Sequence, residues 1–270
     1  MKSRSEQIKR ARPLLGTLVE ISIEADANAE ASVAGAFAAI ARVHALMSSQ
    51  EGNSDVSRIN RLCPGECLEI DEWTYKVLAR AIDIHKMTDG LFDCTASAVP
   101  GSELEASGSE RPSTADIELL PGNFLRVHRR ARITLDGIAK GFAVDIAVES
   151  LVGAGIASGV VNAGGDLRIF GGRSEPVFVR VPNAPGRFSR IGPFSDRAVA
   201  SSGDYFGNSS LINPITGKRV GYSHAMTVVA GDCMTADALT KPCLLSPERS
   251  RKFAESFGAT AVFTAPAGNN

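Results

Sequence analysis

The sequence predicts an α+β fold in which mixed β-sheets pack against helices, and three observations lead to this class. The chain has 270 residues, 44% hydrophobic and 22% charged, which is the composition of a globular protein with a substantial core. Apolar residues recur at helical spacing in some segments and alternate with polar residues in others. The middle of the chain, about 159–201, is rich in short strands, which argues against a simple doubly wound sheet.

The first expected strand covers about 17–24, where Val19, Ile21 and Ile23 alternate with polar residues. Before it, a basic segment is followed by an apolar stretch, as in a signal peptide. Pro13 and Gly16 interrupt that stretch, so we expect no export signal. No apolar run approaches the ~20 residues that cross a bilayer. We therefore expect a cytoplasmic protein without membrane insertion.

Two helices are expected next, separated by a polar loop. Apolar residues from Val33 to Met47 have helical spacing, and a second helix begins at Asp71 and ends at Gly90. The stretch 100–114 is rich in Ser, Gly, Glu and Pro and is expected to be a flexible loop. It would join possible halves 1–100 and 115–270 of a single domain, 1–270.

The remaining elements follow from the same periodicities. A strand is expected near 124–134 and a helix at about 138–153. Further strands are expected near 159–163, 167–170, 177–181, 197–201 and 226–230. The chain would end with helices from about 234 and at 246–257, and with a strand at 259–264.

Charge and cysteine content exclude several classes of function. A net charge of −1 gives no electrostatic footprint for nucleic acid. The five cysteines are an odd number with only one close pair and no histidine cluster beside them. They are expected to be reduced thiols and not a zinc site. A small molecule is the expected ligand.

The segment 133–145 is the strongest indication of a functional site. Asp136, Lys140 and Asp145 lie there among small and apolar residues. An ionised group in such surroundings is costly unless a partner or ligand compensates its charge. Asp145, inside the expected helix, is interpreted as closing an ion pair.

Two glycine segments leave alternatives open. The segment 162–166 closes an apolar strand with Gly164 and Gly165, which suits either a turn with positive φ or a loop that touches a phosphate or a flat ring. The segment 200–206 places Ser202 and Gly203 after a short strand. It suits either a plain turn or a phosphate-binding loop.

The segment 236–241 places three polar side chains on one helical face. Asp237, Thr240 and Lys241 stand at i, i+3 and i+4, so they can meet around one ion or substrate group. A surface ion pair between Asp237 and Lys241 is the alternative. The surrounding residues are Ala, Leu, Cys and Met, which favours a functional interpretation.

These segments, in this order, resemble the ApbE family of flavin transferases. Leu14-Leu-Gly-Thr17, 54–60 and 91–95 resemble the family's first three motifs. The runs 137–145, 162–166 and 201–205, together with Asn213-Pro-Ile-Thr-Gly217 and 236–239, complete the series. The resemblance implies an ApbE-like, T-fold-like architecture with a cofactor cleft between two halves. It also implies an enzyme that splits FAD, releases AMP, and joins FMN through its phosphate to a Thr or Ser hydroxyl of an acceptor protein, with Mg²⁺ assisting.

The resemblance also assigns site residues. Asp237 would anchor the metal together with the Gly137 carbonyl, and Thr240 and Lys241 stand at or beside the family's second metal position. The catalytic candidates are Asp237, Lys241 and Ser210. The residues expected to contact FAD are Leu15, Gly16, Thr17, Gln50, Leu91, Phe92, Asp93, Thr134, Lys140, Gly164, Gly165, Ser202 and Gly203.

Several positions depart from the family pattern. Ser210 replaces a His, Gln50 replaces an aromatic residue, and Lys241 replaces a Thr that helps to bind the metal. A protonated Lys has no lone pair for a cation. The hypothesis is that the Lys241 ammonium replaces Mg²⁺, and retained Mg²⁺ binding is the alternative. The loss of the His leaves a second function open, an FAD-binding or FAD-hydrolysing relative without protein flavinylation.

Overall fold

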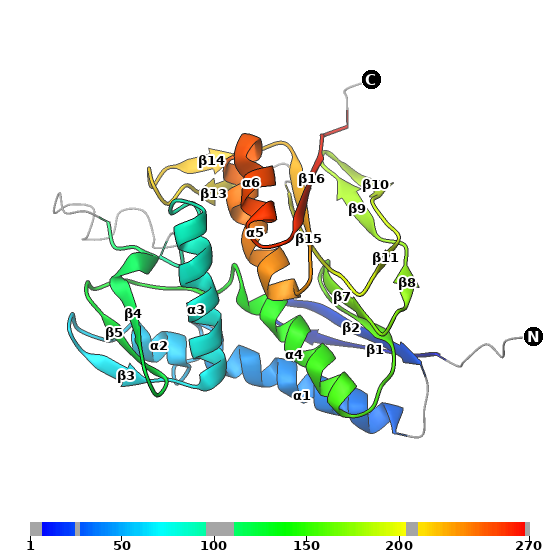
Figure 1. Cartoon of the computed structure of the whole chain (residues 1–270), viewed down its shortest axis with the longest axis horizontal. Helices are drawn as coiled ribbons and strands as arrows, with labels where there is room; N and C mark the ends of the chain where they lie inside the picture. The colour runs from blue at the N-terminus through cyan, green and yellow to red at the C-terminus, as the bar shows by residue number, and fades with distance from the viewer. Residues whose placement is uncertain (1–6, 25–27, 96–110, 204–209, 268–270) are drawn as a thin grey trace, which may run out of the picture.

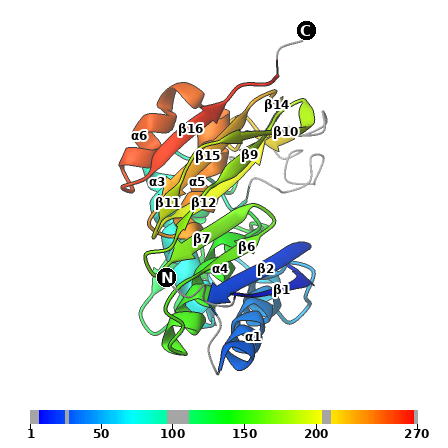
Figure 2. The same ribbon diagram turned by 90° about the vertical axis from the view of Figure 1, so that its right-hand side faces the viewer.

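The computed structural model describes residues 7–24, 28–95, 111–203 and 210–267. Its centre is an antiparallel sheet whose strands lie in the order β1-β2-β6-β7-β12-β15-β16 (Figure 2). The bounds are β1 Gln7–Leu14, β2 Thr17–Glu24, β6 Gly159–Ala163, β7 Asp166–Phe170, β12 Ala198–Gly203, β15 Ala225–Ala230 and β16 Thr260–Thr264. The predicted α+β class is confirmed, as are the expected positions of the strands from β2 onward in this sheet.

Strand β1 was not predicted from the sequence. It forms a hairpin with β2, with Gln7 opposite Glu24 and Leu14 opposite Thr17. The strand lies at the sheet edge and is largely exposed, so its residues are basic and lack the alternation that marks β2. The two-residue turn places Leu15 at φ +55° and Gly16 at φ +69°. Positive φ at both positions suits the twist of a tight hairpin but is unusual for Leu.

Three helices cover one face of this sheet: α1 Ala29–Met47, α4 Ala139–Gly153 and α5 Cys233–Leu245 (Figure 1). All three were expected. Helix α1 is long and apolar enough to pass a length-and-composition test for a membrane span. However, its buried side chains, from Val33 to Met47, recur on one face that packs against α4 and β2. This is the pattern of a core helix.

Short strands cover the other face. They are β8 Ser174–Glu175, β9 Phe178–Val181, β10 Ala184–Arg190 and β11 Phe194–Ser195. A small core of Ile169, Val177, Val199 and Val229 lies beneath them. Of these strands only β9 was predicted, because β8 and β11 have two residues each and show no periodicity, and β10 is irregular, with a register shift between Ala184 and Phe188.

The expected polar loop after α1 contains structure of its own. Ser54 caps the short helix α2 Asp55–Ile59 by accepting from Ser57 N, and Asp71 caps α3 Glu72–Met87 by accepting from Trp73 N. A second sheet has the order β3-β5-β4 and lies beside α2 and α3. Its strands are β3 Cys67–Glu69, β4 Ile117–Leu120 and β5 Phe124–Val127. The expected strand at 124–134 therefore ends early.

The central sheet crosses the boundary between the expected halves 1–100 and 115–270. Strand β2 pairs with β6, with Val19 opposite Ala163, so the N-terminal hairpin belongs to the same sheet as the C-terminal strands. One core cluster extends from Val19 to Ala259. Most of the expected flexible loop at 100–114 lies outside the described residues.

The C-terminal region follows α5. The 3-10 turn η3 Pro247–Arg249 and the helix α6 Ser250–Glu255 fill the expected helix at 246–257, and β16 completes the sheet. A hairpin of β13 Ser210–Ile212 and β14 Arg219–Gly221 lies near α5 and was not predicted. Its turn contains Asn213, whose side chain accepts from the backbone N–H groups of Ile215 and Thr216.

Candidate functional site

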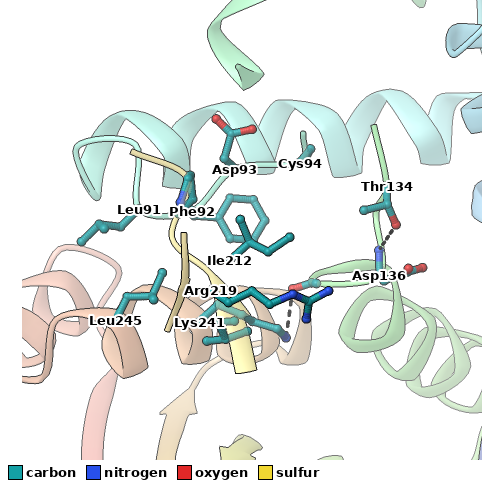
Figure 3. Close-up of a pocket in the computed structure, with 13 residues that line it drawn as sticks. Leu91, Phe92, Asp93, Cys94, Thr134, Asp136, Ile212, Arg219, Lys241 and Leu245 are labelled. Atoms are coloured by element: carbon teal, nitrogen blue, oxygen red, sulfur yellow. Dashed lines mark hydrogen bonds between the residues drawn. The ribbon is translucent and has the colours of Figure 1, made fainter. Parts of the chain in front are cut away.

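A cavity of about 400 Å³ opens between the loop after α3, the segment before α4, and α5 with the β13–β14 hairpin (Figure 3). It brings together six residues expected at the site from three separate parts of the chain: Leu91, Phe92, Asp93, Thr134, Gly137 and Lys241. Asp136, which the sequence singled out in the segment 133–145, also lines it, as do Ile212 and Arg219, which were not expected at the site.

A second cavity, of about 430 Å³, lies between the β1–β2 turn, the end of α1 and the start of α4. Its lining includes five residues expected to contact FAD: Leu15, Gly16, Thr17, Gln50 and Lys140. Asp136 lines both cavities, so the two meet at this residue. Leu15 therefore lies in a different cavity from Leu91, Phe92 and Asp93, with which the resemblance grouped it.

The Lys241 ammonium lies at the floor of the first cavity. Its Nζ is 2.5 Å from Asp237 Oδ1, 3.2 Å from the Asp237 carbonyl oxygen and 3.4 Å from the Gly137 carbonyl oxygen. The other oxygen of the carboxylate, Asp237 Oδ2, accepts from Gly141 N at 3.1 Å. Asp237 is 1% exposed, so Lys241 and the backbone of α4 cover it completely.

The expected metal-ligand set of Gly137, Asp237, Thr240 and Lys241 stays a prediction, and in the structure these groups contact one another. The oxygens of Asp237 and Gly137 are occupied by an ammonium, which has no lone pair. The Thr240 hydroxyl donates to the Asp237 carbonyl at 2.7 Å and lies 2.9 Å from Ser202 Oγ. Within the described residues there is no group of three His, Cys, Asp or Glu side chains that could hold a metal ion.

A second buried ion pair lies beside the second cavity. Lys140 Nζ is 2.5 Å from Asp166 Oδ2, and Asp166 is 2% exposed. Burial, with the nearby Asp237 charge, raises the pKa of Asp166 to about 6, although Lys140 and Lys241 oppose this. Burial lowers the pKa of Lys140, but the attraction of Asp166 and Asp237 outweighs it and leaves the pKa raised. Lys140 and Lys241 are thus two ammonium groups, one at each cavity.

Asp166 was missing from the expected site residues. It ends the segment 162–166, in which only the two glycines were singled out. The available signal was a carboxylate directly after Gly-Gly and directly before an expected strand. Such a charge, once folded into a sheet, needs a partner from another element. His44 also lines the second cavity and was not in the expected set of site residues.

Asp145 has the structural role that was predicted for it. Its carboxylate pairs with Arg168 at 2.8 Å and accepts from the backbone N–H groups of Cys233 and Met234 at the start of α5. Burial raises the pKa of Asp145 to about 6 against the lowering effect of these donors. The residue therefore fixes the N-terminus of α5, and so the positions of Asp237 and Lys241, against α4.

The carboxylate of Asp93 has a structural role as well. It accepts from Thr95 N and Thr95 Oγ1, both at 2.7 Å, and from Thr114 Oγ1 at 3.1 Å, and His85 Nδ1 lies 3.4 Å away. These contacts hold the loop 91–95 in place. Asp93 lines the first cavity, but its oxygens already have partners inside the protein.

Gly164 and Gly165 form the hairpin turn between β6 and β7, with φ +64° and +105°. The turn alternative therefore holds, and Asn162 Oδ1 supports it by accepting from Gly165 N. The turn also packs against the second cavity: a Cβ on Gly164 would lie 2.3 Å from Thr17 Oγ1. The absence of a side chain at Gly164 thus leaves room for Thr17, which lines the second cavity.

Of the remaining expected residues, Ser202 and Gly203 end β12, where Ser202 contacts Thr240 on α5. Neither they nor Thr240 line the two cavities described above. The backbone of Ser210 begins β13 opposite Gly221, and its side chain lies outside the described part of the structure. Thr134 Oγ1 accepts from Asp136 N and so shapes the junction of the cavities (Figure 3).

This chain is similar to known proteins over most of its length. The profile of the ApbE family matches residues 15–263. The FAD:protein FMN transferase of Vibrio cholerae serotype O1 (strain O395) is 30% identical over 246 residues, which cover 79% of this chain and 73% of the relative. The FAD:protein FMN transferase of Treponema pallidum is 23% identical, over 98% of this chain and 86% of the relative.

Solved structures show the same fold. The apo form of the Pseudomonas stutzeri flavinyl transferase ApbE superposes with a TM-score of 0.85 at 21% identity, over 98% of this chain and 93% of that one. The ApbE protein of Thermotoga maritima gives a TM-score of 0.81 at 26% identity, over 97% of both chains. The match to the family profile covers both cavities and both ion pairs, and the chain therefore belongs to the ApbE family of flavin transferases.

Proposed function

We propose that this protein is an FAD:protein FMN transferase, which cleaves FAD and attaches the FMN half to a Thr or Ser hydroxyl of an acceptor protein. Its relatives in the family carry this activity in their names. The observation that carries the proposal is the junction of two cavities at Asp136, with an ammonium group on each side. FAD is two ring systems joined by a pyrophosphate, and such a ligand suits two adjoining pockets with an ammonium group at each.

The reaction forms and breaks one bond at phosphorus. The acceptor hydroxyl oxygen bonds to the phosphorus of the FMN half, the bond from that phosphorus to the bridging oxygen breaks, and AMP leaves with that oxygen. The hydroxyl proton is released to solvent. Catalysis of such a step consists mainly of positioning and charge neutralisation. Lys140 and Lys241 would supply the positive charge, and the loop 91–95 and the β1–β2 turn would position the two halves of FAD.

A second candidate function is FAD binding or hydrolysis without an acceptor protein. The observation in its favour is that no imidazole lies among the described residues that line the first cavity. Ser210, at the position of the family His, cannot act as a base at neutral pH. An enzyme without a base at this position would activate an acceptor hydroxyl poorly.

The test is incubation of the purified protein with FAD and a candidate acceptor protein. Mass spectrometry would detect the added FMN on the acceptor, and chromatography would detect AMP. Both products support transfer. AMP without a modified acceptor indicates a hydrolase, and a bound yellow cofactor with neither product indicates a binding protein.

Two variants sharpen this test. Lys140→Met should lower the rate of AMP release about tenfold or more, because a charge-assisted contact to phosphate is lost. Lys252→Met, on the exposed face of α6, is the matched control and should retain the wild-type rate. Equal rates of AMP release for wild type, Lys140→Met and Lys252→Met would show that Lys140 does not contribute to the reaction.

We also propose the cellular location and the partners that were expected from the sequence. The five cysteines all lie in the described residues and are free thiols, which supports the proposed cytoplasmic location. The proposed partners are FAD and the acceptor protein, without nucleic acid and without membrane insertion.

A further inference from the structure

We infer that the Lys241 ammonium serves as a built-in cation, so that this chain binds the pyrophosphate of its substrate without a divalent metal at Asp237. The inference rests on the proposed function, because it concerns the FAD that this function requires. Two observations support it. Lys241 contacts oxygens of Asp237 and Gly137, and the other polar atoms of Asp237 and Thr240 already have hydrogen-bond partners.

The ammonium occupies the oxygens that a metal would need. Lys241 Nζ contacts one carboxylate oxygen and one carbonyl oxygen of Asp237, and the carbonyl oxygen of Gly137. These three oxygens come from two separate helical regions and converge on one point. A compact cation there neutralises the Asp237 carboxylate and leaves positive charge toward the cavity. The Lys241 side chain is 25% exposed, whereas that of Asp237 is 2% exposed, so a ligand meets the ammonium first.

Magnesium does not fit these residues. Mg²⁺ demands near-octahedral oxygen coordination at about 2.0–2.1 Å. Of the available oxygens, Asp237 Oδ1 is bound by Lys241 and Asp237 Oδ2 accepts from Gly141 N. The Thr240 hydroxyl is paired with the Asp237 carbonyl and with Ser202. A divalent ion would have to displace the ammonium or lie at contact distance from a second cation.

Lys241 cannot easily move aside. It stands four residues after Asp237 on α5, so the two side chains share one face of the helix. Its removal would leave a buried carboxylate whose remaining hydrogen-bond donor, among the described residues, is the backbone N–H of Gly141, which is costly. Gly141 also packs closely against Asp237, since a Cβ at Gly141 would lie only 2.9 Å from Asp237 Cβ. The pair is therefore part of the packed core and not a flexible surface contact.

The longest contact of Lys241 leaves room for a ligand. The distance to the Gly137 carbonyl is 3.4 Å, which is a weak hydrogen bond. A phosphate oxygen that enters the first cavity can take this hydrogen while the contact to Asp237 stays in place. With Lys140 at the second cavity, two ammonium groups would then flank a pyrophosphate at the junction.

The first experiment uses the wild-type protein after dialysis against a chelator. Binding of FAD and of inorganic pyrophosphate is measured by calorimetry with EDTA and with excess Mg²⁺, and binding of Mn²⁺ is measured by electron paramagnetic resonance. We expect the same FAD affinity, within about twofold, in both buffers and no stoichiometric Mn²⁺. Stoichiometric Mn²⁺, or FAD binding that disappears in EDTA and returns with Mg²⁺, would overturn the inference.

The second experiment uses Lys241→Thr, which removes the ammonium and frees the oxygens of Asp237 and Gly137. In EDTA this variant should bind FAD about tenfold more weakly, because it loses one charge-assisted contact. It should recover affinity with Mg²⁺ and acquire a Mn²⁺ signal. Lys252→Thr, on the exposed face of α6, is the matched control and should behave as wild type. A Lys241→Thr protein whose FAD affinity in EDTA equals that of wild type would contradict the inference.

These measurements separate the inference from the proposed function. Failure to detect AMP or a modified acceptor would count against the transferase and leave the metal and binding data unaffected. The wild-type measurements need no variant, so they decide the question even if Lys241→Thr does not fold.

Discussion

The Asn60 side chain forms two hydrogen bonds with the backbone of Ile133. Asn60 Nδ2 donates to the Ile133 carbonyl at 3.0 Å, and Asn60 Oδ1 accepts from Ile133 N at 2.7 Å. The next residue, Thr134, donates its backbone N–H to the carbonyl of Cys94 at 2.9 Å. The segment that carries Asp136 and Gly137 is thus attached on one side to α2 and on the other to the loop after α3.

Asn60→Ala should loosen this segment. The variant leaves the N–H and C=O of Ile133 without side-chain partners, which should lower the free energy of unfolding by about 2 kcal/mol. It should also weaken FAD binding, because Asp136 lies at the junction of the cavities. Denaturant unfolding and calorimetry check both effects.

Ser57→Ala, on the same short helix, is the control for Asn60→Ala. Its hydroxyl makes one 3.3 Å contact with the Ser49 carbonyl, so its loss should change stability by less than about 0.5 kcal/mol. Equal stability losses for both variants would show that the Asn60 contacts do not hold the segment.

Gly141→Ala should disrupt the contact between α4 and α5. The added Cβ would lie 2.2 Å from the Cys233 carbonyl oxygen, a backbone atom that cannot move alone. We expect a loss of about 3 kcal/mol or more in the free energy of unfolding, measured by denaturant titration. Gly153→Ala, in the same helix, has nothing within 4 Å of the new Cβ and should stabilise the protein by about 0.5–1 kcal/mol. Similar outcomes for the two variants would contradict this account.

Gly164→Ala and Gly165→Ala should differ in FAD binding. Both residues have positive φ, so each substitution should cost about 1–3 kcal/mol of stability through backbone strain. Only Gly164→Ala would push on Thr17, because a Cβ at Gly165 has nothing within 4 Å. A fluorescence titration should therefore give weaker FAD binding for Gly164→Ala alone. Weakening by Gly165→Ala to the same extent would argue against transmission through Thr17.

Asp166→Asn should change how stability depends on pH. The pKa of Asp166 is about 6 in the folded protein, above its ordinary value of 3.8. A raised pKa means that the folded state holds the proton more tightly than the unfolded state. The contribution of Asp166 to stability is therefore complete below about pH 3.8 and is lost as the pH rises through about 6. The full difference corresponds to about 3 kcal/mol. Asn cannot titrate and should lack this loss.

The measurement for Asp166 is denaturant unfolding at several values between about pH 4 and pH 7, the window set by the two pKa values. The stability of wild type relative to Asp166→Asn should fall as pH rises across this range. Asp83→Asn, an exposed carboxyl on α3, controls for the loss of one acidic group. Parallel stability curves for wild type and Asp166→Asn would exclude a buried, titrating Asp166.

The sequence alone determined most of the regular elements and the family. The patterns of β2, α1, α4 and α5 are clear in the sequence because each element is regular over many residues. Strand β2 and helix α1 bury one face, and α4 and α5 bury nearly all of their surface. The short strands β8, β10, β11, β13 and β14 were missed, because elements of two or three residues, or irregular edge strands, carry no such signal. Strand β1 was missed because it lies at an exposed edge.

The tertiary structure decided how the charged side chains are paired. The sequence placed Asp237 and Lys241 on one helical face and left a metal site and an ion pair as alternatives. Only the packing of α5 against α4 brings the Gly137 carbonyl to the Lys241 ammonium and the Gly141 N–H to the Asp237 carboxylate, partners that are 104 and 96 residues apart in the chain. The Lys140–Asp166 pair likewise forms only when β7 lies beside α4. Burial makes such pairing obligatory, but the choice of partner depends on distances that periodicity does not encode.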